Sequence, residues 1–137
     1  MEVFADTLYW IAMARPNDSW TAVARQAKAS ISNAELVTTE EVLSEFLTAL
    51  AGGGPTLRRA AATMVRAILS SPGVRVVSQS GESFLAGLAY YESRLDKSYS
   101  MVDCVSMQVM RSREIKSILT NDHHFTQDGF AVLISQE

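Results

Sequence analysis

The sequence has little that would tie it to an oxidising compartment or to a membrane. It contains one cysteine, Cys104, so no disulfide can form within the chain, and a reducing compartment is expected. No apolar run approaches the roughly 20 residues that a membrane-spanning helix needs. Residues 1–4 have the pattern of a strand and lack the basic start of a signal peptide. We therefore expect a cytoplasmic protein with no membrane partner.

Positive charge is also scarce. Lys and Arg number 12 against 15 Asp and Glu, which gives a formal net charge of −3. This balance argues weakly against a protein that binds long duplex nucleic acid through its phosphates. It is compatible with an enzyme whose excess carboxylates surround one metal ion, because the ion supplies the local positive charge.

The composition is that of a folded protein. Hydrophobic residues make up 47% of the chain and charged residues 20%, so disorder is not expected. The 137 residues suffice to bury a core, and no internal repeat, low-complexity segment or linker divides them. We expect a single domain over residues 1–137.

Strand patterns alternate with helix patterns along the chain. Strands are expected at residues 3–5, 36–38, 74–77, 115–120 and 130–134. Helices are expected at residues 7–14, 19–32, 40–51, 56–71, 81–95 and 100–112, with Pro16 at a helix start and a turn at 121–125. Helical crossovers of this length connect parallel strands. The pattern predicts a three-layer α/β/α fold with a central, mainly parallel sheet.

Three acidic residues fall at one edge of this sheet. Asp6 ends the first strand, Asp122 follows a late strand, and Asp103 lies in the first turn of a helix. Ligands of open parallel sheets collect outside the carboxyl ends of the strands, where such helices also begin. Each acid also has a simpler explanation as a cap: Asp6 for the helix at Thr7, Asp122 for a turn, and Asp103 in a capping box with Ser100.

Capping does not explain Glu45, which lies in the middle of a helix without a basic partner on that helix. Phe46 and Leu50 make much of this helix apolar, so we expect Glu45 to border the buried face. An unpaired carboxylate there costs several kcal/mol or takes up a proton. A metal ion or an Arg from elsewhere in the fold would remove that cost. Glu41 is the rival in the same helix, ranked second because its spacing from Thr38 suits a cap.

These four carboxylates are not accompanied by a cluster of cysteines, so they favour Mg²⁺ or Mn²⁺ over zinc. Mg²⁺ binds through few protein carboxylates and keeps several waters. This suits hydrolysis of a phosphodiester, in which the ion orients and activates water and neutralises charge on the phosphate.

Four segments, taken in order, resemble the PIN-domain ribonucleases, and more narrowly the VapC-like toxins of bacterial and archaeal toxin–antitoxin pairs. They are residues 4–7 (FADT), 38–46 (TTEEVLSEF), 96–104 (DKSYSMVDC) and 119–125 (LTNDHHF), the last followed by Gly129 and Phe130. The segments span nearly the whole chain, and the ordered set is more specific than any one of them. The resemblance implies a PIN-like fold and metal-dependent cleavage of RNA.

The family's acidic quartet falls on Asp6, Glu45, Asp103 and Asp122. By this resemblance, Asp6 and Asp103 would hold Mg²⁺ or Mn²⁺ most directly, while Glu45 and Asp122 would complete the site and help to orient water. The resemblance also implies supporting hydroxyl groups. These would come from Thr7, Ser100 and Thr120.

The resemblance further implies a single-stranded or structured RNA substrate, a homodimer and a small antitoxin that occupies the acidic site. Five basic residues near the acids in sequence are candidates for phosphate contacts, with a solvated helix face as the alternative. They are Arg94, Lys97, Arg111, Arg113 and Lys116. Apolar helix faces within residues 16–51 are a candidate partner surface. The alternative function is a non-catalytic PIN-fold module that binds RNA or a protein.

Two kinds of residue beside the acids are not assigned to the chemistry. His123 and His124 are adjacent in sequence, so their side chains should point apart, and direct metal ligation is not expected. Cys104 has no base at a fixed spacing, which favours a small buried thiol over a nucleophile.

Overall fold

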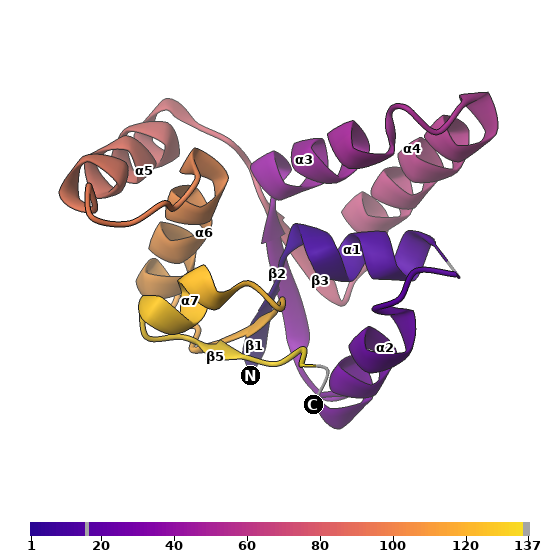
Figure 1. The fold of residues 1–137 in the computed structure, drawn as a ribbon, viewed down its shortest axis with the longest axis horizontal. Helices are drawn as coiled ribbons and strands as arrows, with labels where there is room; N and C mark the ends of the chain where they lie inside the picture. The colour runs from indigo at the N-terminus through magenta and orange to yellow at the C-terminus, as the bar shows by residue number, and fades with distance from the viewer. Residues whose placement is uncertain (16, 136–137) are drawn as a thin grey trace.

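A five-stranded sheet in which every neighbouring pair is parallel forms the centre of the computed structural model, which describes residues 1–15 and 17–135 (Figure 1). The strands are β1 (Glu2–Ala5), β2 (Glu35–Thr39), β3 (Val74–Val77), β4 (Ser117–Leu119) and β5 (Ala131–Val132). Their order in the sheet is β3-β2-β1-β4-β5. The α/β class and the parallel sheet expected from the sequence are confirmed.

The strand order reverses at β1. The chain builds outward from β1 through β2 to β3, and then returns to place β4 and β5 on the other side of β1. Figure 1 shows α1 (Thr7–Ala14), α2 (Thr21–Ser30), α3 (Glu40–Leu50) and α4 (Pro55–Ser70) on one side of the sheet. On the other side lie α5 (Gly81–Ser93), α6 (Met101–Ser112) and α7 (His123–Gln127). Neighbouring strands β1 and β4 therefore lead to opposite layers, which leaves room for a ligand beyond their carboxyl ends.

The central strands are buried on both faces. Val3, Phe4 and Ala5 of β1 are each 1% exposed or less, and Ile118 of β4 is fully buried. A parallel strand covered by helices on both faces reads as a continuous apolar run, which is why β1 shows no alternation. Within the described residues, no helix has the length and apolar character needed to cross a membrane.

Several regular elements are shorter than the apolar pattern predicts, whereas β1 and β2 are slightly longer. Helix α2 begins at Thr21 instead of residue 19, and α5 ends at Ser93 instead of residue 95. Strands β4 and β5 occupy only 117–119 and 131–132 of the expected 115–120 and 130–134. Some residues next to the strands are buried without belonging to the sheet. Ile115 is one of them, because its N–H donates to the Met110 carbonyl of α6 and it therefore belongs to the turn before β4. The expectation for Pro16 lies outside the described residues.

Two further expectations about local structure need correction. The segment 121–125, expected as a turn, contains the start of α7, because Asp122 caps that helix by accepting a hydrogen bond from the His124 N–H at 2.9 Å. Helix α3 is capped by Thr39, which accepts from Val42. Thr38 instead donates to the carbonyl of Ala5 at 2.9 Å, so the spacing between Thr38 and Glu41 does not mark a cap.

Candidate functional site

Asp6 lies directly beyond β1 and is connected to the end of β4. It occupies the N-cap position of α1, yet its side chain makes no capping hydrogen bond there, so the cap explanation for Asp6 is wrong. The hydroxyl of Thr120 donates to Asp6 Oδ2 at 2.9 Å and accepts from the Asp122 N–H at 3.2 Å. Thr120 thus holds Asp6 and Asp122 together across the point where the strand order reverses.

Asp103 sits at the start of α6 in the capping box that the sequence predicts. The Ser100 N–H donates to Asp103 Oδ2 at 3.1 Å, and the Asp103 N–H donates to the Ser100 hydroxyl at 3.0 Å. The cap explanation is therefore confirmed. It does not account for every contact of the carboxylate, because the same Oδ2 lies 3.4 Å from Nδ1 of His124 on α7.

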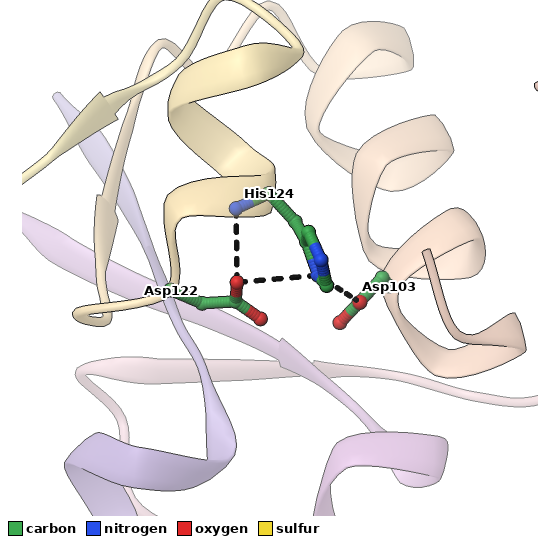
Figure 2. A group of neighbouring side chains, drawn as sticks. All are labelled: Asp103, Asp122 and His124. Atoms are coloured by element: carbon green, nitrogen blue, oxygen red, sulfur yellow. Dashed lines mark hydrogen bonds and ion pairs between the residues drawn. The ribbon is translucent and has the colours of Figure 1, made fainter. Parts of the chain in front are cut away.

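His124 enters the site, contrary to the expectation from sequence. Its Nδ1 lies 3.2 Å from Asp122 Oδ1 and 3.4 Å from Asp103 Oδ2 (Figure 2). Ligand atoms of Asp103, Asp122 and His124 all lie within 4.8 Å of one another. His123 is exposed, so the two histidines do point apart. The unforeseen feature is α7: its capping by Asp122 turns the following backbone, and the His124 ring then faces the acids.

Glu45 is exposed, whereas the buried face of α3 is formed by Val42, Leu43, Phe46 and Leu50. Its Oε1 accepts a hydrogen bond from the hydroxyl of Thr7 on α1. Among the described residues it forms no ion pair, so the structure does not provide the salt bridge considered as its alternative role.

Glu41 remains a rival to Glu45. It lies one turn earlier on the same face of α3, as its spacing of four residues requires. Its Oε2 is buried and has no hydrogen-bond partner among the residues that the structure describes. Glu41 therefore keeps a buried oxygen that is free to accept a hydrogen bond or to bind a ligand.

Burial and mutual repulsion shape the electrostatics of these acids. Removal from water raises the pKa of Asp6 to about 7, and the charges of Asp103 and Glu45 add to the rise. Hydrogen bonding from the Thr7 backbone N–H and the Thr120 hydroxyl opposes it. Burial also raises the pKa of Asp103, and the neighbouring charge of Asp122 adds to it. We call Asp6, Glu45, Asp103 and Asp122 the acidic edge.

Within the described part of the chain, no Lys or Arg forms an ion pair with the acidic edge. The excess negative charge is therefore left for a ligand to neutralise. Carboxylate oxygens with one imidazole nitrogen are a donor set that a divalent metal ion accepts. The residues present thus fit a divalent cation.

Each of the three hydroxyl residues contacts one of the acids. Thr7 donates to Glu45 and Thr120 to Asp6, whereas Ser100 holds Asp103 through its backbone N–H. Cys104 is fully buried, and this burial raises the pKa of its thiol to about 11. A thiol that stays protonated is consistent with the packing role expected for it.

Two of the candidate phosphate contacts are engaged elsewhere, around the carboxylate of Asp128. Arg111 Nη1 lies 2.6 Å from Asp128 Oδ2, and Arg94 Nε lies 3.8 Å from Oδ1. The hydroxyls of Tyr90 and Tyr99 donate to the same carboxylate at 2.6 and 3.2 Å. These five residues form what we call the Asp128 cluster, which sequence analysis did not detect because its members are far apart in sequence.

The remaining candidates divide between the two ends of the sheet. Arg113 pairs with Glu2 at 2.7 Å, and Lys116 is exposed just before β4, so both lie at the amino-terminal edge of the strands, away from the acidic edge. Lys97 lines a groove together with Ser98 and Ser100, which contact His124 and Asp103 respectively. Of these three cations only Lys97 lines this groove, and its ammonium lies 3.5 Å from the carboxylate of Asp96.

The parallel sheet, the acidic edge and the four ordered segments of the sequence agree with one family. The PIN domain matches residues 3–130 of the chain. The chain belongs to the PIN-domain family. No curated protein sequence matches it.

Solved PIN structures place the chain more narrowly. A toxin from Mycobacterium tuberculosis, VapC20, described as cleaving the sarcin-ricin loop, is 27% identical over 97% of this chain and 99% of its own, with a TM-score of 0.84. FitAcB from Neisseria gonorrhoeae is 13% identical over 97% of this chain and 96% of its own, with a TM-score of 0.66, and shares the PIN fold. The resemblance to VapC-like PIN ribonucleases is confirmed.

Proposed function

We propose that this PIN-domain protein is a metal-dependent endoribonuclease that hydrolyses RNA phosphodiester bonds, and that it is the toxin of a toxin–antitoxin pair. The observation that carries the proposal is the acidic edge: four carboxylates at the point where the strand order reverses, with no Lys or Arg among the described residues paired to them. The likeness to VapC20, a toxin that cleaves an RNA loop, supports RNA as the substrate class.

The acids have distinct places in this proposal. Asp6 and Asp103 hold Mg²⁺ or Mn²⁺ most directly, and Glu45 and Asp122 complete the site and orient water. A bound ion would neutralise charge on the phosphate and activate the water. Hydrogen bonds fix two of the carboxylates in position: the Thr120 hydroxyl donates to Asp6, and the Ser100 N–H donates to Asp103. Such fixed side chains lower the reorganisation needed at the reacting bond.

Two protein partners belong to the proposal, a second copy of the chain and a small antitoxin. Five large apolar side chains that are exposed lie within residues 84–95. They are Phe84, Leu85, Leu88, Tyr91 and Leu95. Within the described part of residues 16–51, where the sequence predicted a partner surface, Leu47 is the one such side chain. Phe84, Leu88 and Tyr91 also line the groove that contains Lys97 and Ser100. An exposed apolar patch of this kind supports a protein contact close to the acidic edge.

The test is cleavage of a mixed single-stranded RNA pool by purified, partner-free protein in Mg²⁺, Mn²⁺ or EDTA. Wild type should cut with metal and not in EDTA. Asp103→Asn should lose at least about 100-fold of the rate, since even residues that only support a metal ligand contribute 10- to 100-fold. Glu114→Gln, which also removes one negative charge but at an exposed position at the other edge of the sheet, should cut like wild type.

The opposite result would also be informative. Folded wild-type protein that cuts no RNA with either ion, at high protein concentration, would contradict the nuclease and favour the non-catalytic binding module. The mass of the purified protein in solution, measured by light scattering, tests the homodimer separately. Twice the chain mass is expected, and the mass of one chain would contradict it.

A further inference from the structure

The imidazole of His124 is held from its outer side. Its Nε2 lies 3.1 Å from the Ser98 hydroxyl, and its ring meets the Tyr99 ring edge to face, with 5.4 Å between the centroids. A metal-binding histidine is usually fixed in this way, through a hydrogen bond to the nitrogen that does not face the metal. The contacts therefore fix the ring in the orientation that directs Nδ1 toward the acids (Figure 2).

The inner nitrogen has no partner that satisfies it. Nδ1 is shielded from solvent and makes no hydrogen bond of good geometry with any residue that the structure describes. Its nearest polar atoms are the carboxylate oxygens of Asp103 and Asp122, at 3.4 and 3.2 Å. When the ring carries its proton on Nε2 and donates it to the Ser98 hydroxyl, the Nδ1 lone pair faces two carboxylates, and a cation between the three groups removes the repulsion.

The spacing of these atoms suits a shared cation. Bonds of about 2.1 Å at right angles separate two neighbouring ligands of an octahedral ion by about 3 Å. The two distances from Nδ1 are close to this value, and the three ligand atoms fall within 4.8 Å. We propose that His124 Nδ1 is a direct ligand, together with Asp103 and Asp122, of the divalent ion at the acidic edge, and that it makes the site prefer a transition-metal ion to Mg²⁺.

The preference follows from the chemistry of the donors. Mg²⁺ takes oxygen ligands almost exclusively and retains its waters, whereas imidazole is a good ligand for first-row transition ions. The inference rests on the metal site of the proposed nuclease. It goes further by adding a nitrogen ligand that the acidic quartet does not contain.

The experiment measures metal binding without RNA. Mn²⁺ bound to the full chain is examined by electron spin-echo envelope modulation, which detects directly bonded nitrogen, and calorimetry gives the Mn²⁺ and Mg²⁺ affinities. Wild type should show coupling to one imidazole nitrogen and should bind Mn²⁺ at least tenfold more tightly than Mg²⁺. His124→Gln should lose the coupling and most of that preference, while His123→Ala, a matched change at an exposed histidine, should retain both.

A second variant guards against misfolding. His124→Asp should still bind metal through oxygen, and it should show neither the nitrogen coupling nor the tenfold preference. Wild type without nitrogen coupling, with Mn²⁺ bound or not, would overturn the inference even if the protein cuts RNA. Nitrogen coupling in a protein that cuts no RNA would uphold the inference and contradict the nuclease, so the two failures are distinguishable.

Discussion

The short helix α7 begins and ends at an aspartate, and the two aspartates have opposite surroundings. At its end, the Asp128 carboxylate is almost completely buried and meets the hydroxyls of Tyr90 and Tyr99 and the guanidinium of Arg111. At its start, Asp122 lies beside the carboxylate of Asp103 and the imidazole of His124. The Asp128 carboxylate has a guanidinium and two hydroxyl donors built into the chain, whereas the Asp122 carboxylate has one backbone donor, the His124 N–H, and no Lys or Arg partner among the described residues.

This difference separates a structural acid from one that awaits a ligand. A buried carboxylate is tolerated when charged partners and donors satisfy it, as at Asp128. At the acidic edge, burial raises the pKa of Asp6 and Asp103, and the charges of neighbouring acids add to the rise. Glu41 Oε2 and His124 Nδ1 are buried atoms that have no hydrogen-bond partner among the described residues. This arrangement of buried acids and unsatisfied polar atoms lowers the stability of the fold, and a bound cation is its simplest explanation.

The largest effect on stability should come from breaking the Asp128 cluster. Asp128→Asn replaces an acceptor oxygen with an NH₂ group that faces Arg111 and two tyrosine hydroxyls. We expect a loss on the order of 3 kcal/mol in the free energy of unfolding, because the remaining polar groups lose their partner. Urea unfolding measures it. Asp103→Asn, at the acidic edge, should be neutral or stabilising without metal, and equal losses in the two variants would remove the contrast.

Glu41 and Glu45, on the same face of α3, sharpen the description of the acidic edge. Glu45→Gln should slow RNA cleavage by roughly 100-fold, since it weakens a carboxylate that Thr7 holds beside Asp6. Glu41→Gln is the matched control on the same helix face and should keep most of the rate. Single-turnover cleavage compares them directly. The reverse order of effects would transfer the fourth position of the quartet to Glu41.

The pH dependence of stability should distinguish Asp6 from an ordinary acid. Its pKa rises from 3.8 to about 7 in the folded protein, so the folded state binds the proton more tightly than the unfolded chain does. Stability from this group is full below about pH 4 and is lost as the pH rises through 7. In metal-stripped protein, wild type should lose on the order of 2 kcal/mol relative to Asp6→Asn between these limits. Parallel curves for the two proteins, measured by urea unfolding, would contradict the raised pKa.

The smallest effect is expected at the amino-terminal edge of the sheet. Arg113→Ala removes a partly exposed ion pair with Glu2 and should cost at most about 1 kcal/mol. It should leave RNA cleavage unchanged, because it lies away from the acids. Lys97→Ala should raise the RNA concentration needed for half-maximal cleavage while changing stability little. Cleavage that depends on Arg113 and not on Lys97 would mean that RNA follows the other edge.

Local sequence signals predicted the fold and much of the acidic edge. Apolar runs located the strands, the spacing of Ser100 and Asp103 identified a capping box that the structure confirms, and the ends of the strands placed Asp6 and Asp122 on one rim. These features depend on residues within a few positions of each other or on the general geometry of parallel sheets. These features can therefore be predicted from short segments of the sequence.

Features that depend on distant contacts were missed. The Asp128 cluster joins residues 90, 94, 99, 111 and 128, and no spacing in the sequence relates them. His124 was set aside because adjacent side chains diverge, which is true of the pair but does not say which one faces the acids. Glu45 was expected nearer the core, since the apolar face of α3 could not be positioned exactly enough against the sheet.

The most direct test of the central claim is calorimetric titration of Mn²⁺ into metal-stripped wild type, Asp103→Asn and Asp128→Asn, each shown by circular dichroism to be folded. If the acidic edge lacks a cation that a metal supplies, wild type should bind Mn²⁺, Asp128→Asn should bind it similarly, and Asp103→Asn should bind it at least about tenfold more weakly. Wild-type protein that is folded yet binds no Mn²⁺ at millimolar concentration would contradict the claim.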